Sequence, residues 1–144
     1  LREAVEKNPN DADAILQLAN LNYDIKGWQR ATDLYERYLK LRPENADVLT
    51  DLGVTLREQG RPQDALARFR RAAELNPQHW QSRFNQAVVL GLDLQDFDGA
   101  LKVLTELRML QPDNPSINEL STEIERRKGS GGAAAPAPKP GAGR

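Results

Sequence analysis

The sequence predicts an all-α solenoid built from antiparallel helix pairs. The first observation is a repeat of about 34 residues, marked by prolines spaced 34, 34 and 35 residues apart: Pro9, Pro43, Pro77 and Pro112. The second is an alanine twelve residues before each closing proline, at Ala31, Ala65 and Ala100. A third is a large side chain eight residues before the proline, at Tyr35, Phe69 and Leu104. Repeats of this length must stack on one another to bury their apolar stripes.

Each period contains two short segments with apolar residues at helical spacing. In the middle period the first segment is VLTDLGVTL and the second is ALARFRRAAEL. Gly60 suits the position just after the first helix, and Pro62 suits the first turn of the second, where a missing N–H is harmless. Asp11 and Asn45 are the expected N-caps of the first helices of periods one and two. The sequence therefore predicts a helix–turn–helix unit in each period.

At these positions the chain resembles the tetratricopeptide repeat (TPR) family. The second period matches the family pattern in both helices, at Leu49, Leu52, Gly53, Leu56, Ala65, Phe69, Ala72 and Pro77. The first period matches at Ile15, Leu18, Ala19, Ala31, Tyr35 and Pro43. The third keeps Phe84, Asn85, Ala87, Leu90, Ala100, Leu104 and Pro112. The resemblance implies a right-handed TPR superhelix in which the first helix of each repeat, helix A, lines the concave surface.

Several positions depart from the family pattern. In the first period, Asn22 and Tyr38 replace an aromatic and a small residue, and the turn glycine Gly27 falls one position late. In the third, Arg83 and Gln86 occupy two positions that are usually apolar, and GLDLQDFD contains one extra residue. The third repeat is therefore the loosest match.

The same landmarks predict the domain organisation. Residues 1–9 match the end of a truncated preceding repeat, and three TPR repeats follow at about 10–43, 44–77 and 78–113. We expect a C-terminal capping helix at 114–128, with Ile117, Leu120 and Ile124 as its apolar stripe. Residues 129–144 are rich in Gly, Ala and Pro and are expected to form a disordered tail.

Composition excludes several classes of function. Twenty Lys and Arg balance 21 Asp and Glu, so the basic excess usual in nucleic-acid binders is missing, and we expect no nucleic-acid partner. Five arginines between Arg57 and Arg71 form the most basic stretch, but most belong to the outer helix, where acidic neighbours pair them. Cysteine is absent, which excludes disulfides and suits cytoplasm and periplasm equally. No run approaches the roughly 18 apolar residues of a membrane span.

The sequence offers little for catalysis or for binding a cofactor. His79 is the only histidine, so neither a zinc-binding histidine pair nor an HExxH helix exists, and we expect His79 to cap or pack. No phosphate-binding glycine motif or nucleophile elbow is present. The acidic stretch DLQDFDG resembles a calcium-binding loop, but with Gly99 at the sixth position the first and last ligand positions would be Leu94 and Thr105. We therefore expect a polar turn between helices at this place. The sequence therefore predicts a non-enzymatic chain without metal or cofactor.

The family resemblance places a peptide-binding groove along the A helices. Its expected lining, carried across position by position, is Leu16, Asn20, Tyr23, Asp47, Thr50, Asp51, Val54, Arg57, Gln81, Phe84, Asn85 and Val88. Five of these side chains are apolar or aromatic yet lie outside the packing stripe: Leu16, Tyr23, Val54, Phe84 and Val88. Apolar side chains on a face meant for solvent indicate a binding surface. Cover from the truncated repeat or the C-terminal helix is the alternative explanation.

The lining argues against one activity of the family, the capture of acidic C-termini by a two-carboxylate clamp. The clamp positions carry Leu16, Asn20, Asp51, Gln81 and Asn85 in place of Lys, Asn, Asn, Lys and Arg. Asp51 would repel a carboxylate. The lining instead suits an extended segment with apolar anchors and a basic side chain facing Asp47 or Asp51, its backbone held by the amides of Asn20 and Asn85.

Three functions fit these observations. The leading hypothesis is a non-catalytic interaction module that binds a partner peptide or helix in the concave groove. The alternatives are a self-assembling scaffold and an assembly factor of a bacterial envelope, similar to the TPR regions of cytochrome c biogenesis proteins. If the groove is real, Phe84→Ala or Asn20→Ala should weaken partner capture without changing helicity.

Overall fold

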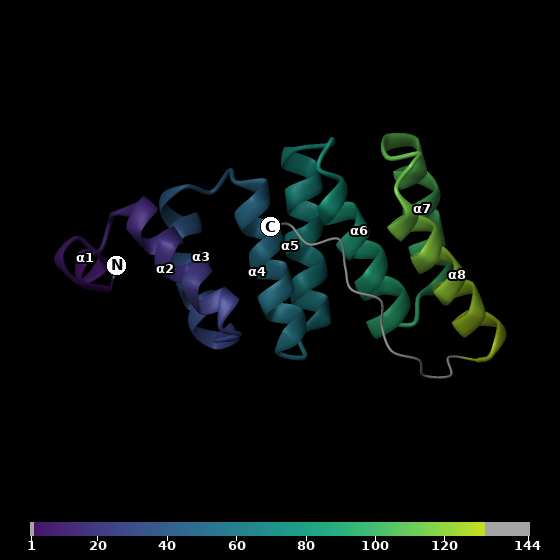
Figure 1. Cartoon of the computed structure of the whole chain (residues 1–144), viewed down its shortest axis with the longest axis horizontal. Helices are drawn as coiled ribbons and strands as arrows, with labels where there is room; N and C mark the ends of the chain where they lie inside the picture. Colours follow the sequence, from purple (N-terminus) through teal and green to yellow (C-terminus); the bar gives the residue numbers. More distant parts are fainter. Residues whose placement is uncertain (1, 132–144) are drawn as a thin grey trace.

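The fold is a row of helices. A computed structural model of the chain describes residues 2–131. The helices stand side by side along the long axis of the molecule (Figure 1). Within the described residues there is no strand, and the elements in order are α1 (Arg2–Lys7), α2 (Ala12–Asp24), α3 (Trp28–Leu41), α4 (Ala46–Glu58), α5 (Pro62–Leu75), α6 (Trp80–Val88), the π-helix η1 (Val89–Asp93), α7 (Phe97–Leu110) and α8 (Pro115–Gly129).

Helices that follow one another in the chain pack together. α2 contacts α3, α4 contacts α5 and α6 contacts α7, while α3, α5 and α7 each contact the first helix of the next unit. Such nearest-neighbour contacts are typical of a solenoid, in which each repeat buries its apolar face against the next. The predicted all-α solenoid of antiparallel helix pairs is confirmed.

The residues that mark the repeat in the sequence are buried in the hydrophobic core. Ala31, Ala65 and Ala100 are completely buried in α3, α5 and α7, where small side chains let the paired helices approach closely. The large side chains four positions later, Tyr35, Phe69 and Leu104, are buried as well. One contiguous cluster runs from Val5 in α1 to Ile124 in α8.

The turn between the two helices of each repeat needs one residue in the left-handed region. Gly60 fills it in the second repeat with φ +74°, as expected for the residue after a helix. Lys26 and Gln95 take the same place in the first and third repeats, with φ of 62° and 58°. Gly27 does not, because it precedes α3 with φ −79°. In the first repeat, Lys26 therefore takes the left-handed position that glycine takes in the second, and Gly27 is the residue that follows it.

The extra residue of the third repeat forms η1. Leu94 N donates to Val89 O at 2.9 Å, which is the i→i+5 bond of a π-helix. A single added residue in a helix is commonly absorbed in such a turn, because the helix widens locally and keeps its register on either side. The 35-residue spacing between Pro77 and Pro112 therefore has a local cause at Val89–Asp93.

The predicted N-caps are confirmed. Asp11 Oδ1 accepts from Ala14 N at 3.1 Å, and Asn45 Oδ1 accepts from Val48 N at 3.1 Å. Pro62 stands at the first position of α5, where no N–H is required. These local signals determine where the helices of the first two repeats begin.

After the third helix pair, α8 packs against α7. Its stripe of Ile117, Leu120 and Ile124 is buried, as the sequence predicts. Lys128 Nζ donates to Asp98 Oδ1 at 2.6 Å and so ties α8 to α7. The division into repeats and flanking segments stays a prediction, and from residue 132 onward the predicted tail lies outside the described residues.

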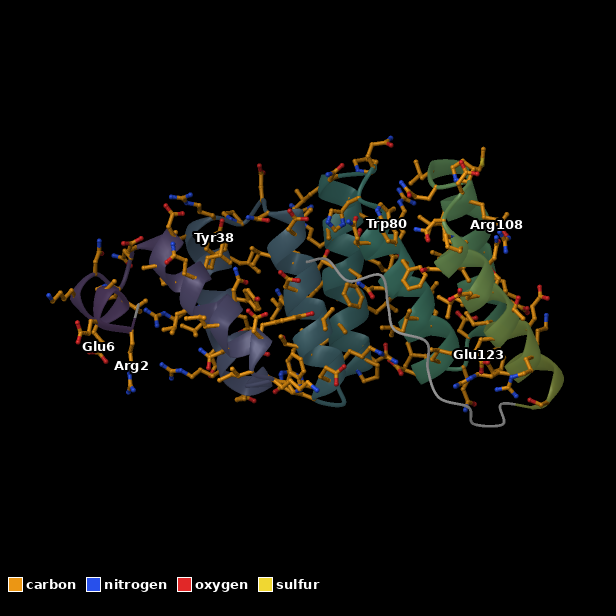
Figure 2. The ribbon with its side chains drawn as sticks, viewed as in Figure 1. Arg2, Glu6, Tyr38, Trp80, Arg108 and Glu123 are labelled. Carbon is orange, nitrogen blue, oxygen red and sulfur yellow. The ribbon has the colours of Figure 1, made fainter. Side chains whose placement is uncertain are left out.

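An acidic side chain near the end of α8 makes a pH-dependent contribution. Glu123 accepts from Arg126 Nη2 and from Arg127 Nε, both at 2.7 Å (Figure 2). These hydrogen bonds, with that of Arg126 as the first cause, lower the pKa of Glu123 from 4.5 to about 2. A lowered folded-state pKa stabilises the fold above the unfolded value and loses that effect as the pH falls toward the folded value.

We therefore expect the free energy of unfolding to fall between pH 4.5 and about pH 2 more steeply in the wild type than in Glu123→Gln. Urea titrations at several pH values in this range measure the two slopes. Identical slopes would show that the ion pairs of Glu123 contribute nothing to folding.

Candidate binding groove

The A helices α2, α4 and α6 carry the predicted lining, and the structure divides it into two groups. Seven side chains are at least partly accessible: Leu16, Asn20, Tyr23, Asp47, Val54, Arg57 and Gln81. Five are buried: Thr50, Asp51, Phe84, Asn85 and Val88. The accessible group lies on α2, α4 and the first turn of α6. The accessible lining residues therefore lie on the A helices of the first two repeats and on the first turn of α6.

Phe84 and Val88 are core residues, which corrects the interpretation of them as solvent-facing anchors. Phe84 is 1% exposed and Val88 is fully buried. The rings of Phe84 and Trp80 stand nearly perpendicular to each other, with 6.2 Å between their centroids. The physical reason is that α6 packs against α5 and α7 and also contacts α4, so that neighbouring helices cover side chains outside its own stripe.

The π-helix η1 packs against α7 and approaches α8 closely. Gly91 in η1 lies so close to α8 that a Cβ at this position would stand 2.7 Å from Ile124 Cδ1. Only a residue without a side chain allows that approach. Gly91 therefore belongs to the packed interface between η1, α7 and α8.

The two asparagines expected to hold a peptide backbone differ in position. Asn20 is partly accessible, and its Oδ1 accepts from the Tyr35 hydroxyl at 2.7 Å, which orients the amide. Asn85 is 2% exposed, and its Nδ2 has no hydrogen-bond partner within the described residues. Of the two, only Asn20 has a surface position in this conformation.

Arg57 lies in an ion pair that the sequence did not reveal. Its Nε donates to Asp93 Oδ2 at 2.5 Å and its Nη2 to Asp93 Oδ1 at 3.0 Å, a two-bond geometry that fixes the guanidinium. Asp93 is the last residue of η1, so the inserted residue helps to bring it to α4. The only signal in the sequence was the extra residue in GLDLQDFD. Arg57 thus ties repeat two to repeat three.

Tyr23 and Val54 form the apolar part of the accessible lining, together with Leu16. All three are partly buried and pack against the core. The Tyr23 ring stands edge-on to Trp28, with centroids 5.4 Å apart, and to Tyr35 at 6.4 Å. Aromatic contacts of this kind hold a ring in one orientation. These side chains form the partly accessible apolar part of the predicted lining.

His79 caps α6 and contacts the groove residue Asp47. Its Nδ1 accepts from Ser82 N at 3.2 Å, so the proton of the neutral ring sits on Nε2, which lies 2.7 Å from Asp47 Oδ1. The Asp47 side chain remains 71% exposed. His79 therefore has the capping role expected from the sequence, and it holds one carboxylate oxygen of Asp47 in place.

The A helices are acidic in composition. The helices α2, α4, α6 and η1 carry six carboxylates against two arginines: Asp13, Asp24, Asp47, Asp51, Glu58 and Asp93 against Arg57 and Arg83. The outer helices α3, α5 and α7 carry eight basic residues against six acidic ones. A groove of one sign of charge attracts partners of the opposite sign. Basic segments therefore suit the A-helix face.

Within residues 2–131 no group of three or more histidine, aspartate or glutamate side chains is arranged to hold a metal ion. Among the described helices, none is long and apolar enough to cross a membrane.

The chain was compared with protein families and known proteins. A family model described as "Tetratricopeptide repeat" matches residues 26–88 and again 56–124. The chain is 32% identical over 90 residues to the human protein named Protein O-mannosyl-transferase TMTC3. The match covers 62% of this chain and 10% of that relative, so the chain spans only a tenth of its length.

Solved structures share the fold. The crystal structure of MamA superimposes with a TM-score of 0.82 at 18% identity, covering 91% of this chain and 75% of the other. The first TPR of Spaghetti (RPAP3), bound to the HSP90 peptide SRMEEVD, superimposes with a TM-score of 0.76 at 17% identity, covering 82% and 93%. At these identities the likeness concerns the fold alone.

Proposed function

The chain belongs to the tetratricopeptide repeat family, a family of protein-interaction modules, and we propose that it binds a partner peptide or helix on the face formed by α2, α4 and the first turn of α6. The observation that carries this proposal is the combination of half-buried apolar side chains with exposed carboxylates on one face. Leu16 and Val54 supply the apolar contacts, and Asp47 supplies an exposed charge. We define this set, with Asn20, Tyr23 and Gln81, as the concave site.

The chemistry of the concave site favours a basic segment with an apolar anchor. A partner's lysine or arginine would approach Asp47, whose side chain is exposed and oriented by His79. A neighbouring apolar side chain would cover Leu16 and Val54, and the Asn20 amide would hydrogen-bond to the partner backbone. Electrostatic attraction would speed association, while the apolar contact would set the residence time.

An acidic C-terminal peptide fits this site poorly. The solved TPR of Spaghetti holds the peptide SRMEEVD, in which the glutamates and aspartate give a negative charge. The positions at which clamp-type TPRs carry lysine read Leu16 and Gln81 here, and Asp51 lies between them along the solenoid. A negative peptide would meet an acidic face without a compensating lysine.

We propose no catalytic role for this chain. The transferase named among its relatives is ten times longer than the match, so its activity is not transferred to these residues. The two buried serines are engaged locally: Ser82 Oγ donates to His79 O at 2.8 Å, and Ser121 Oγ donates to Ile117 O at 2.9 Å. Both hydroxyls therefore donate to backbone carbonyl groups of their own segment.

A random peptide phage library selected on the wild-type chain tests the proposal. We expect selected peptides to combine lysine or arginine with one large apolar residue, and Val54→Gln to raise their dissociation constant about tenfold or more, since a buried anchor contact contributes over 1 kcal/mol. The matched control is Met109→Gln, which changes an 86% exposed apolar residue of α7.

The control should bind like the wild type. Selected peptides that are mainly acidic, or that bind Val54→Gln and the wild type equally, would contradict the concave site. Circular dichroism of both variants verifies that the helices are intact.

A further inference from the structure

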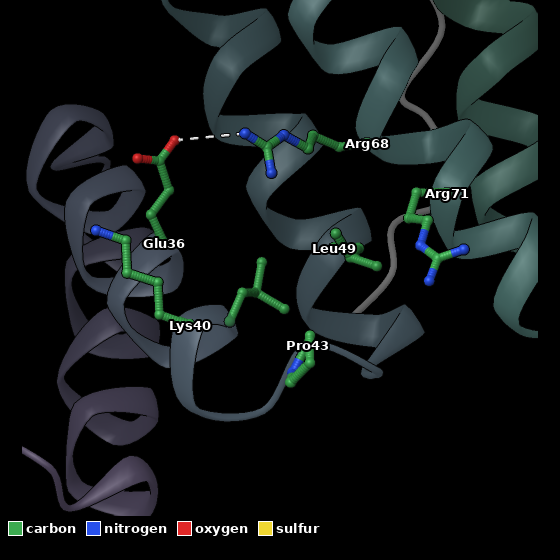
Figure 3. Close-up of a pocket in the computed structure, with 7 residues that line it drawn as sticks. Glu36, Lys40, Pro43, Leu49, Arg68 and Arg71 are labelled. Atoms are coloured by element: carbon green, nitrogen blue, oxygen red, sulfur yellow. Dashed lines mark ion pairs between the residues drawn. The ribbon is translucent and has the colours of Figure 1, made fainter.

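A second hollow lies on the opposite, outer side of the solenoid, between α3 and α5. It encloses about 340 Å³ and is lined by Glu36, Leu39, Lys40, Pro43, Leu49, Arg68 and Arg71. In Figure 3, Glu36 and Lys40 of α3 face Arg68 and Arg71 of α5 across the hollow, with Leu49 of α4 between the two walls. We call it the outer hollow. It shares no residue with the concave site.

The walls of the outer hollow are basic. Lys40 forms no ion pair or hydrogen bond within residues 2–131, so its charge is available. Arg68 meets Glu36 only at 3.8 Å, with both side chains about 40% exposed, and Arg71 meets Glu74 at 3.4 Å, with both side chains more than half exposed. Exposed ion pairs of this kind contribute little and exchange readily. Three cations thus surround the opening, with one carboxylate among the lining residues.

The back of the outer hollow is apolar. Leu49 is buried and closes the hollow, while Leu39 is partly buried and packs against the core. Pro43 forms one rim. An apolar side chain entering here would leave water and contact three apolar residues. A hollow of this size is at the lower end of those that bind ligands, large enough for one or two side chains.

The equivalent hollow one repeat later lacks this combination. It is lined by Arg70, Ala73, Glu74, Pro77, Arg83 and Gln86. Relative to the outer hollow, Leu39 corresponds to Ala73, Lys40 to Glu74 and Leu49 to Arg83. The repeat geometry alone therefore makes a depression, and the residues of the outer hollow make it apolar at the back and basic at the rim.

We propose that the outer hollow is a second docking surface, for an acidic peptide segment carrying one apolar side chain. The apolar side chain would sit against Leu49, and flanking carboxylates would pair with Lys40 and Arg71. Charge complementarity selects this occupant, because the concave site has the opposite sign. The chain would then bind a basic segment on one face and an acidic segment on the other, as an adaptor does.

A nucleic acid is the less suitable occupant. The lining contains no aromatic residue on which a base could stack, and Glu36 and Glu74 stand among the cations. Apolar residues at the back of the hollow offer nothing to a phosphate backbone.

The test uses a fluorescein-labelled peptide of sequence EDELEDE and its charge-reversed counterpart KRKLKRK, added to the ¹⁵N-labelled chain. We expect the acidic peptide to shift backbone amides of α3 and α5 around the outer hollow. The variant Lys40→Glu/Arg71→Glu should raise its dissociation constant about tenfold or more. Arg70→Glu is the matched control, since Arg70 is exposed on the same helix and lines the next hollow.

The proposal stands if Arg70→Glu changes the dissociation constant by less than about twofold. It is overturned if the acidic peptide does not bind, if its shifts map to α2 and α4, or if Arg70→Glu weakens binding as much as the double variant. A ten-residue polyuridine that shifts the same amides would assign the hollow to RNA instead. Concentration-dependent shifts without peptide would assign it to a second copy of the chain. Because the proposal does not use the concave site, Val54→Gln must leave EDELEDE binding unchanged.

Discussion

Phe84→Ala is expected to lower the free energy of unfolding by about 3–5 kcal/mol, the usual cost of removing a buried aromatic side chain. Phe84 is 1% exposed, and its loss would open a cavity beside Trp80 and Val88, both of which pack in the same cluster. Since a domain of this size has only about 5–15 kcal/mol of stability, the variant should be close to unfolding. Urea denaturation followed by circular dichroism measures the loss.

Gln81→Ala is the matched control, since it removes a partly accessible polar side chain from the same helix. Its unfolding free energy should stay within about 0.5 kcal/mol of the wild type. A Phe84→Ala chain as stable as this control would mean that α6 does not pack as described. Because Phe84 is a core residue, Phe84→Ala would impair the capture of any partner through unfolding. A loss of binding in this variant would therefore not locate the binding surface.

Gly53→Val is expected to destabilise the chain by about 1–3 kcal/mol, the range of overpacked cores. A Cβ on Gly53 would stand 2.4 Å from Cε1 of the Phe69 ring, which is itself 1% exposed and cannot move outward. Ala19 and Ala87 occupy the equivalent positions of the other repeats, where a methyl group is tolerated. The second repeat therefore depends on glycine because its partner ring lies closer.

A double-mutant cycle separates this contact from any effect of valine on the helix. Phe69→Ala alone should cost about 3–5 kcal/mol, and adding Gly53→Val should cost less than the sum, because the valine fills part of the cavity. Strict additivity of the two unfolding free energies would contradict the close approach of Gly53 to Phe69.

The repeat architecture could be predicted from the sequence because its signals are local. The spacing of Ala31, Ala65 and Ala100 identifies the helix pairs, and the caps Asp11 and Asn45 place the helix starts. Each signal acts within one or two turns of helix. The family resemblance further implies that the A helices line the concave surface. The TPR solenoid that it implies is the fold observed.

The open part of the groove could not be predicted, because accessibility is decided between repeats. Phe84 and Val88 lie outside the stripe of their own repeat, and their burial follows from the packing of α6 against its neighbouring helices. The pairing of Arg57 with Asp93 depends on the π-turn, whose geometry one inserted residue does not specify in advance. The positive φ of Lys26 could not be predicted either, because a residue with a Cβ disfavours this conformation and only the packing of the two helices imposes it.

The most direct test of the concave site is to map a bound peptide on the ¹⁵N-labelled chain, using a basic, apolar-anchored peptide selected on the wild type. We expect the largest amide shifts on α2 and α4 around Leu16, Asn20, Asp47 and Val54, and we expect Val54→Gln to abolish them. Shifts confined to α3, α5 and α7, or shifts that persist in Val54→Gln, would contradict binding on the concave face.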